Sequence, residues 1–109
     1  MKPFTWSEEK NILLKKFRGV SFEDVEKAIL NNKLFASIEH YNQQKYPGQK
    51  VFVIEISDYA YYVPYIEEEE FYFLKTIFPN RKATKKYIKK GLNLWRVKIL
   101  KNIMTLITN

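Results

Sequence analysis

Residues 51–66 read VFVIEISDYAYYVPYI, and this stretch decides the fold. β-Branched and aromatic side chains, which favour extended backbone, fill both of its halves. The polar pair Ser57-Asp58 separates the halves, so the stretch predicts antiparallel strands at 51–56 and 59–66 joined by a tight turn. Pro64 has no amide hydrogen to donate, which predicts that its strand lies at a sheet edge or is broken there by a bulge.

Strand patterns continue on both sides of this hairpin. Downstream, residues 71–78 form a third β-rich run, reached through an acidic turn at 67–70. Upstream, residues 34–41 alternate between apolar and polar positions, as a half-buried strand does, and lead into a polar loop at 42–49. The sequence therefore predicts a four-stranded, mainly antiparallel sheet.

Two helices are predicted before the sheet. Ser7 is placed to cap a helix at 8–17, which carries an apolar stripe and stops at Gly19. Ser21 repeats the capping signal, and apolar residues at helical spacing continue to Asn31. The chain is thus expected to open with a helical hairpin.

Helices are also predicted after the sheet. Asn80 is placed to cap a basic helix at 81–90. Beyond Gly91, an apolar stripe at helical spacing consists of Leu92, Trp95, Ile99, Ile103 and Leu106. We expect this stripe to pack against its own domain; the alternatives are that it packs against a second copy of the chain or against a protein partner. The predicted class is α+β, in the order α-α-β-β-β-β-α-α, with a domain at 1–90 and a helical extension of it at 91–109.

Composition narrows the function. A chain of 109 residues with 46% hydrophobic residues has room for one core and enough apolar side chains to fill it. It has no cysteine and one histidine, so we expect neither a disulfide nor a metal site, and no cofactor. No apolar stretch approaches the ~20 residues that span a bilayer, which predicts a cytoplasmic protein without a membrane partner.

Charge is distributed unevenly along the chain. Residues 1–70 hold nine Lys and Arg against twelve Asp and Glu, whereas residues 71–109 hold ten Lys and Arg and no acidic residue. Such a concentrated cationic surface attracts phosphates and releases their counterions. This favours a nucleic-acid partner; the alternative is a charged face that only keeps the protein in solution.

Two blocks of sequence carry a family resemblance. The first consists of Phe4-Thr5-Trp6, Glu9-Lys10-Asn11 and residues 19–24, which read GVSFED; the second is RKATKK at 81–86. In this order the blocks resemble BrnT-type toxins of bacterial toxin–antitoxin pairs. The resemblance covers residues 4 to about 90. It departs from the family at Lys16-Phe17-Arg18, where the family commonly has Lys-His, so no histidine role transfers there.

The resemblance implies a fold and a function. The fold is expected to be related to RelE-like ribonucleases, and the activity to be an endoribonuclease that stops translation. A DNA-binding antitoxin is the implied protein partner. The expected assembly is either a homodimer of this chain or a toxin–antitoxin hetero-oligomer. The segment at 92–109 lies beyond the usual family pattern.

Metal-free cleavage of RNA requires proton transfer and, above all, cations that stabilise a negatively charged phosphorane. We therefore consider Arg81, at the start of the basic helix, and Lys75, on the preceding strand, as phosphate ligands and catalytic residues. Glu23 and His40 are the candidates for handling a proton. Each has a structural alternative: a solvated arginine, an outward-facing lysine, an acid in a helix's first turn and a partly buried histidine.

The predicted RNA-binding residues surround these four. They are Lys16, Arg18, Lys82, Lys85 and Tyr61. Lysine and arginine at the end of the first helix also suit the negative helix end, and Tyr61 can stack on an unpaired base or pack in the core. The predicted function is a metal-independent endoribonuclease toxin; the alternative is a non-catalytic nucleic-acid-binding or partner-binding module.

Overall fold

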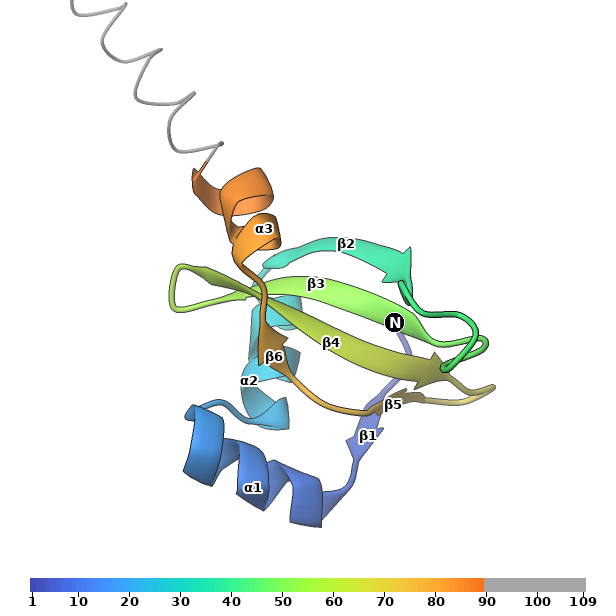
Figure 1. The fold of residues 1–109 in the computed structure, drawn as a ribbon. Helices are drawn as coiled ribbons and strands as arrows, with labels where there is room; N and C mark the ends of the chain where they lie inside the picture. The colour runs from blue at the N-terminus through green and yellow to red at the C-terminus, as the bar shows by residue number, and fades with distance from the viewer. Residues whose placement is uncertain (90–109) are drawn as a thin grey trace, which may run out of the picture.

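The computed structural model describes residues 1–89 and has a mixed α+β fold built on one sheet (Figure 1). Its elements, in chain order, are β1 (Phe4–Trp6), α1 (Glu8–Arg18), α2 (Phe22–Leu30), β2 (Leu34–Glu39), β3 (Lys50–Ile56), β4 (Tyr59–Glu67), β5 (Tyr72–Leu74), β6 (Phe78–Pro79), α3 (Arg81–Ala83) and the π-helical η1 (Thr84–Lys89). The predicted helix at 92–108 and the extension at 91–109 lie outside the described residues.

The sheet has six strands in place of the predicted four. The order is β1-β5-β4-β3-β2, with β6 paired to β4, and the pairings other than β1–β5 are antiparallel. Strand β1, before the first helix, is absent from the predicted order. It pairs in parallel with β5, and a three-residue strand is too short to show periodicity in the sequence.

The predicted strand at 71–78 is in fact two short strands, and Pro64 explains why. Strand β4 pairs with β5 beyond Pro64 and with β6 before it. The Pro64 carbonyl accepts the Lys75 N–H at 2.8 Å, so the side of Pro64 that lacks a donor faces the β5–β6 segment. Pro64 therefore lies in a central strand, and the prediction of an edge strand was wrong; the sheet is interrupted on the opposite side from β3.

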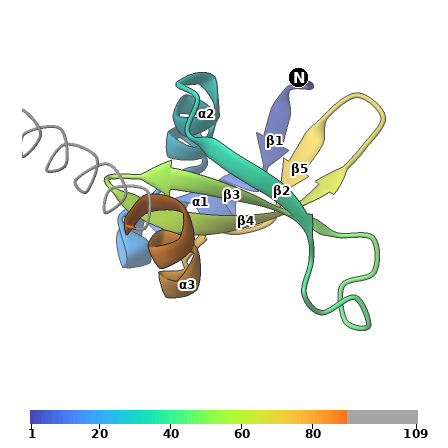
Figure 2. The same ribbon diagram turned by 90° about the horizontal axis from the view of Figure 1, so that it is seen from above.

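Each face of the sheet has its own apolar cluster. Helices α1 and α2 cover one face through Leu14, Phe22, Val25 and other residues packed on β3 and β4. On the other face, Ala83 and Ile88 pack against Val53 and Ala60. Figure 2 shows α3 and the β2–β3 loop on the same side of the sheet, with α2 on the opposite side.

The opening helical hairpin forms as its capping residues predict. The Ser7 side chain accepts the Lys10 N–H at 3.2 Å, and Gly19 takes the left-handed conformation (φ 68°) that ends α1. Ser21 and Asp24 form a reciprocal capping box at the start of α2. Local hydrogen bonding thus fixes the ends of both helices.

The last described helix differs from its prediction. Asn80 caps it as expected, by accepting the Ala83 N–H at 2.8 Å. Its α-helical part, however, spans only Arg81–Ala83 and continues as the π-helical η1. Buried Thr84 is the first residue of η1. Its hydroxyl donates to the Asn80 carbonyl at 2.8 Å and accepts the Ala60 N–H at 2.9 Å. A tertiary contact with β4 therefore accompanies the change in helix type.

This contact gives a first prediction. Thr84→Val keeps the side-chain shape but removes the partner of the buried Ala60 N–H, so the free energy of unfolding is expected to fall by about 1–3 kcal/mol. Urea denaturation followed by circular dichroism measures the loss. Thr84→Ser keeps the hydroxyl and should lose less than Thr84→Val; equal losses for the two variants would contradict the role of the hydrogen bond.

Candidate functional site

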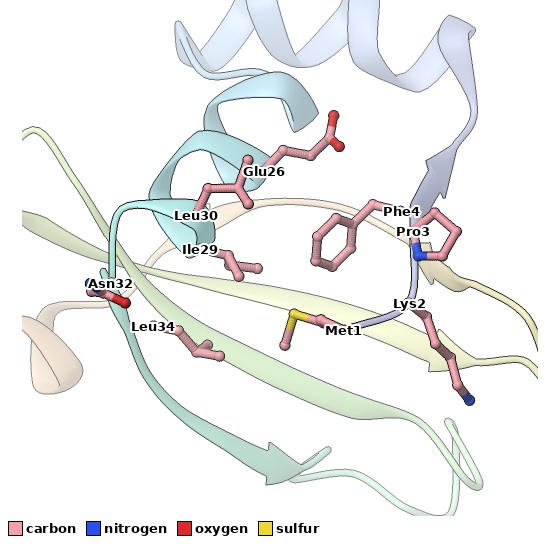
Figure 3. Close-up of a pocket in the computed structure, with 9 residues that line it drawn as sticks. All are labelled: Met1, Lys2, Pro3, Phe4, Glu26, Ile29, Leu30, Asn32 and Leu34. Carbon is pink, nitrogen blue, oxygen red and sulfur yellow. The ribbon is translucent and has the colours of Figure 1, made fainter.

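A hollow of about 630 Å³ lies between β1, α2 and the start of β2, and its lining is mainly apolar (Figure 3). Phe4, Ile29 and Leu34 point toward its interior, while the charged ends of Lys2 and Glu26 point away from it (Figure 3). None of the predicted site residues lines it. Its chemistry is therefore unsuited to a phosphate.

A smaller hollow, of about 280 Å³, has a different lining. We call it the His40 pocket; it is lined by Lys10, His40, Tyr41, Tyr46, Gln49, Pro64, Lys75, Thr76 and Phe78. The lining comes from α1, the β2–β3 loop, β4, the segment between β5 and β6, and β6 itself. The pocket thus lies where Pro64 interrupts the sheet, and it brings together two predicted catalytic residues, Lys75 and His40.

His40 is held firmly in this pocket. Its side chain is only 5% exposed although it follows the end of β2. The backbone N–H of His40 donates to the Gln49 carbonyl at 2.9 Å, and its Nδ1 accepts the Asn42 N–H at 3.1 Å. The ring also packs against the rings of Tyr41 and Tyr46, with centroids 4.4 and 4.5 Å away. The imidazole therefore has a fixed position and orientation.

These contacts define what His40 offers to a ligand. Because Nδ1 accepts a hydrogen bond, a neutral imidazole carries its proton on Nε2. No group of residues 1–89 bonds Nε2, and no buried side-chain nitrogen or oxygen in this part of the chain lacks a partner, so Nε2 reaches solvent. A neutral His40 thus carries an Nε2–H that has no partner among residues 1–89, on a ring that lines the pocket. This geometry suits binding of an anion better than acceptance of a proton at Nε2.

Two lysines give the pocket its positive charge. Lys75 is exposed, and its backbone is fixed by the bond to Pro64. Lys10 comes from the first turn of α1, where its backbone N–H is held by Ser7. Among the described residues, neither ammonium has a carboxylate within 4.0 Å, and no Asp or Glu belongs to the lining. Neither charge is therefore neutralised by a carboxylate of residues 1–89, and the Lys75 ammonium lies over the ring of Phe73, 5.5 Å from its centroid.

The predicted residues at the end of α1, Lys16 and Arg18, do not line the His40 pocket. Arg18 donates from its guanidinium to the Ile77 carbonyl, which ties α1 to the segment that carries Lys75. Arg18 also lines a neighbouring hollow of about 220 Å³, which shares Lys10 with the His40 pocket. The Lys16 ammonium lies over the Phe17 ring, 5.4 Å from its centroid. Arg18 therefore has a structural role beside any contact with RNA.

Glu23, the other proton-handling candidate, is not in the pocket. Its two carboxylate oxygens accept hydrogen bonds from the Asn11 amide at 2.9 and 2.8 Å, and Lys15 lies 3.5 Å away. The Asn11 bonds, with a smaller contribution from the Lys15 charge, hold the pKa of Glu23 below its usual value. The structure thus places Glu23 in the link between α1 and α2, as an ionised hydrogen-bond acceptor.

Arg81, Lys82 and Lys85 are exposed on α3 and η1, and none of them lines the pocket. Lys75 bonds β4 at Pro64, whereas Asn80 bonds it at Ala60, which puts the two attachment points about 13 Å apart along the strand. These cations extend the positive surface beyond the pocket.

The sequence did not identify every lining residue. Tyr61, predicted to contact RNA, is half-buried and packs against the core on the α1–α2 face. Tyr41 and Tyr46 were not predicted, because Tyr41 ends the predicted strand at 34–41 and residues 42–49 have the composition of an ordinary polar loop. Lys10 lies within the first resemblance block, but that block gives it no role. The available signal was the single histidine with tyrosines one and six positions after it.

Comparisons with known proteins add no relative. No family model, no curated protein and no solved structure matches this chain. Within residues 1–89, no helix combines the length and apolarity needed to cross a bilayer. The function is therefore inferred from the geometry and charge of the His40 pocket.

Proposed function

We propose that this protein is a metal-independent endoribonuclease of the BrnT-like toxin type, and that its His40 pocket binds the phosphate that is cleaved. The observation that carries the proposal is the convergence of two lysines and a fixed Nε2–H donor in a hollow without a carboxylate. Charge-assisted hydrogen bonds from such donors stabilise the extra negative charge of a phosphorane.

The proposed reaction needs no metal. The RNA 2′-oxygen attacks the adjacent phosphorus, the bond to the 5′-oxygen breaks, and a 2′,3′-cyclic phosphate and a 5′-hydroxyl form. Because no carboxylate lines the pocket, the 2′-hydroxyl proton passes to water, and a lysine ammonium, from Lys10 or Lys75, protonates the departing oxygen. His40 donates from Nε2 to a phosphate oxygen throughout.

The cations outside the pocket have a separate role in this proposal. Arg81, Lys82 and Lys85 on one side, and Lys16 and Arg18 on the other, hold phosphates that flank the cleaved one. Such contacts position the strand and strengthen binding without reading its sequence. A cognate antitoxin is the proposed protein partner, and the cytoplasm the proposed compartment.

One observation favours a second function, a non-catalytic RNA-binding module. The pocket lacks a carboxylate, and the His40 Nδ1 is occupied, so no side chain in it is an evident general base. The same lysines bind phosphate equally well when no bond is broken. The two functions share the site and differ only in what happens to the bound RNA.

Incubation of the purified protein with 5′-labelled single-stranded RNA separates the two functions. With excess EDTA present, we expect fragments that end in a 2′,3′-cyclic phosphate, and no fragments from a folded Lys75→Ala variant. Arg81→Ala, outside the pocket, is expected to weaken binding while saturated cleavage persists. If the protein binds the RNA and leaves it intact, the ribonuclease proposal is wrong and the non-catalytic module is supported. If the protein neither binds nor cleaves the RNA, both proposals are wrong.

A further inference from the structure

Tyr41 is the most exposed residue of the pocket's aromatic group, and its position is nevertheless fixed. Its side chain is 76% exposed, next to a histidine that is only 5% exposed. The Tyr41 and His40 rings stack, with centroids 4.4 Å apart and planes 29° apart. One face of the tyrosine is thus occupied by the imidazole, and the exposure places the other face in solvent.

The backbone beside Tyr41 holds this arrangement in place. Asn42 donates its N–H to the His40 ring, and its side-chain oxygen accepts the Lys45 N–H at 3.1 Å. Gln43 bonds the carbonyls of His40 and Gln49 at 2.8 and 3.2 Å. A platform ordered before binding loses little conformational entropy when a ligand stacks on it. The loop therefore supports an aromatic surface that is ready to receive a planar group.

The surroundings indicate which planar group fits. Tyr41 lines the same hollow as Lys10 and Lys75, so an aromatic face and two cations are available to one ligand. A nucleotide carries both a planar base and a phosphate. Bases inside a duplex already stack on their neighbours, whereas an unpaired base is free to stack on an aromatic side chain.

We infer that the outer face of Tyr41 is a base-binding subsite, on which one unpaired base of a single-stranded RNA stacks beside the phosphate held by the two lysines. This inference rests on the proposed function and adds the substrate class to it. Stacking on a ring face is tolerant of base identity, so the subsite selects single strands over duplexes without selecting a sequence.

Fluorescence anisotropy tests the subsite with a labelled 2′-O-methyl single strand, which cannot cyclise and stays intact. Tyr41→Ala is expected to weaken its binding about tenfold or more, and Tyr41→Phe, which keeps the ring, by less than about threefold. Tyr59→Ala is the matched control, because Tyr59 lies at the opposite end of the β3–β4 hairpin from the pocket. It should bind as the unchanged protein does.

A second strand, with abasic sugars at every position, isolates the contribution of the bases. It is expected to bind the unchanged protein and Tyr41→Ala with equal affinity. Equal weakening of the abasic and the base-carrying strands would show that Tyr41 acts only through the phosphate pocket, and would overturn the subsite. Unchanged binding of the base-carrying strand would overturn it too. If Lys75→Ala still weakens binding in either case, the proposed function stands without the subsite.

Discussion

An Asn11→Asp variant is expected to lose about 3 kcal/mol or more of its free energy of unfolding at neutral pH. Asn11 is fully buried, accepts the Phe22 N–H on its Oδ1 at 2.8 Å, and donates its amide group to Glu23. Aspartate keeps the acceptor but removes the donors, and so directs a buried carboxylate at the half-exposed carboxylate of Glu23. The attractive hydrogen bonds between residue 11 of α1 and Glu23 of α2 are then replaced by repulsion between two carboxylates.

The pH dependence of this loss has a defined sign. In the unchanged protein the pKa of Glu23 is lowered, so its contribution to stability is present above the unfolded-state value and is lost as pH falls through the folded-state value. In Asn11→Asp the facing carboxylates raise each other's pKa, so protonation stabilises the folded variant as pH falls from 7 towards 4.5. Stability should therefore rise on acidification only in the variant.

Chemical denaturation at pH 7 and pH 4.5 measures both effects. Asn11→Leu is the control without a second carboxylate; it should also be unstable, because the Phe22 N–H loses its partner, but without the rise at pH 4.5. An Asn11→Asp variant that is as stable as the unchanged protein at pH 7, or that loses stability on acidification, would contradict the arrangement.

Replacing Lys10 and Lys75 together by alanine is expected to weaken binding of single-stranded RNA about 100-fold, since each charge-assisted contact contributes about 1.5 kcal/mol or more. The slope of log affinity against log salt should also become shallower by about 0.7, because the contact with one phosphate is lost. Anisotropy titrations over a range of salt concentrations give both quantities. The reason for the large effect is that neither ammonium is neutralised by a carboxylate within residues 1–89.

A matched control changes the net charge equally at other places. Lys33 and Lys50 form ion pairs with Glu55 and Glu67 at 3.4 and 3.7 Å, and neither lysine lines the pocket. Lys33→Ala with Lys50→Ala should therefore leave affinity and salt slope nearly unchanged. Equal losses in the two double variants would mean that net charge, and not the His40 pocket, determines RNA binding.

The sequence predicts the locally determined parts of the fold well. Capping by Ser7, Ser21 and Asn80 is visible in the sequence because each side chain bonds a backbone group within a few residues. The central hairpin is equally visible from its β-rich runs on either side of Ser57-Asp58. Strand β1 is not visible, because three residues carry no period and its partner, β5, lies near the other end of the described chain.

The candidate site is predictable only in part, for a related reason. Lys75 and His40 meet because Pro64 opens the sheet at their level, and a proline in a sequence does not show which neighbour it separates. Glu23 has the composition of a catalytic acid, yet the buried Asn11 commits it to a structural bond. Lys75 and His40 line the pocket and Glu23 does not, because of contacts between residues far apart in the sequence. A local residue pattern does not show such contacts.

The parallel pairing of β1 with β5 also constrains the order in which parts of the protein fold during synthesis. The Thr5 side chain and the Tyr72 carbonyl that it bonds are 67 positions apart, so the first strand translated waits for the fifth before it finds a neighbour. Closing so long a loop is slow compared with forming the α1–α2 hairpin or the β3–β4 pair. The His40 pocket, which needs Lys75 from the segment after β5, is therefore completed only after residue 75 has left the ribosome.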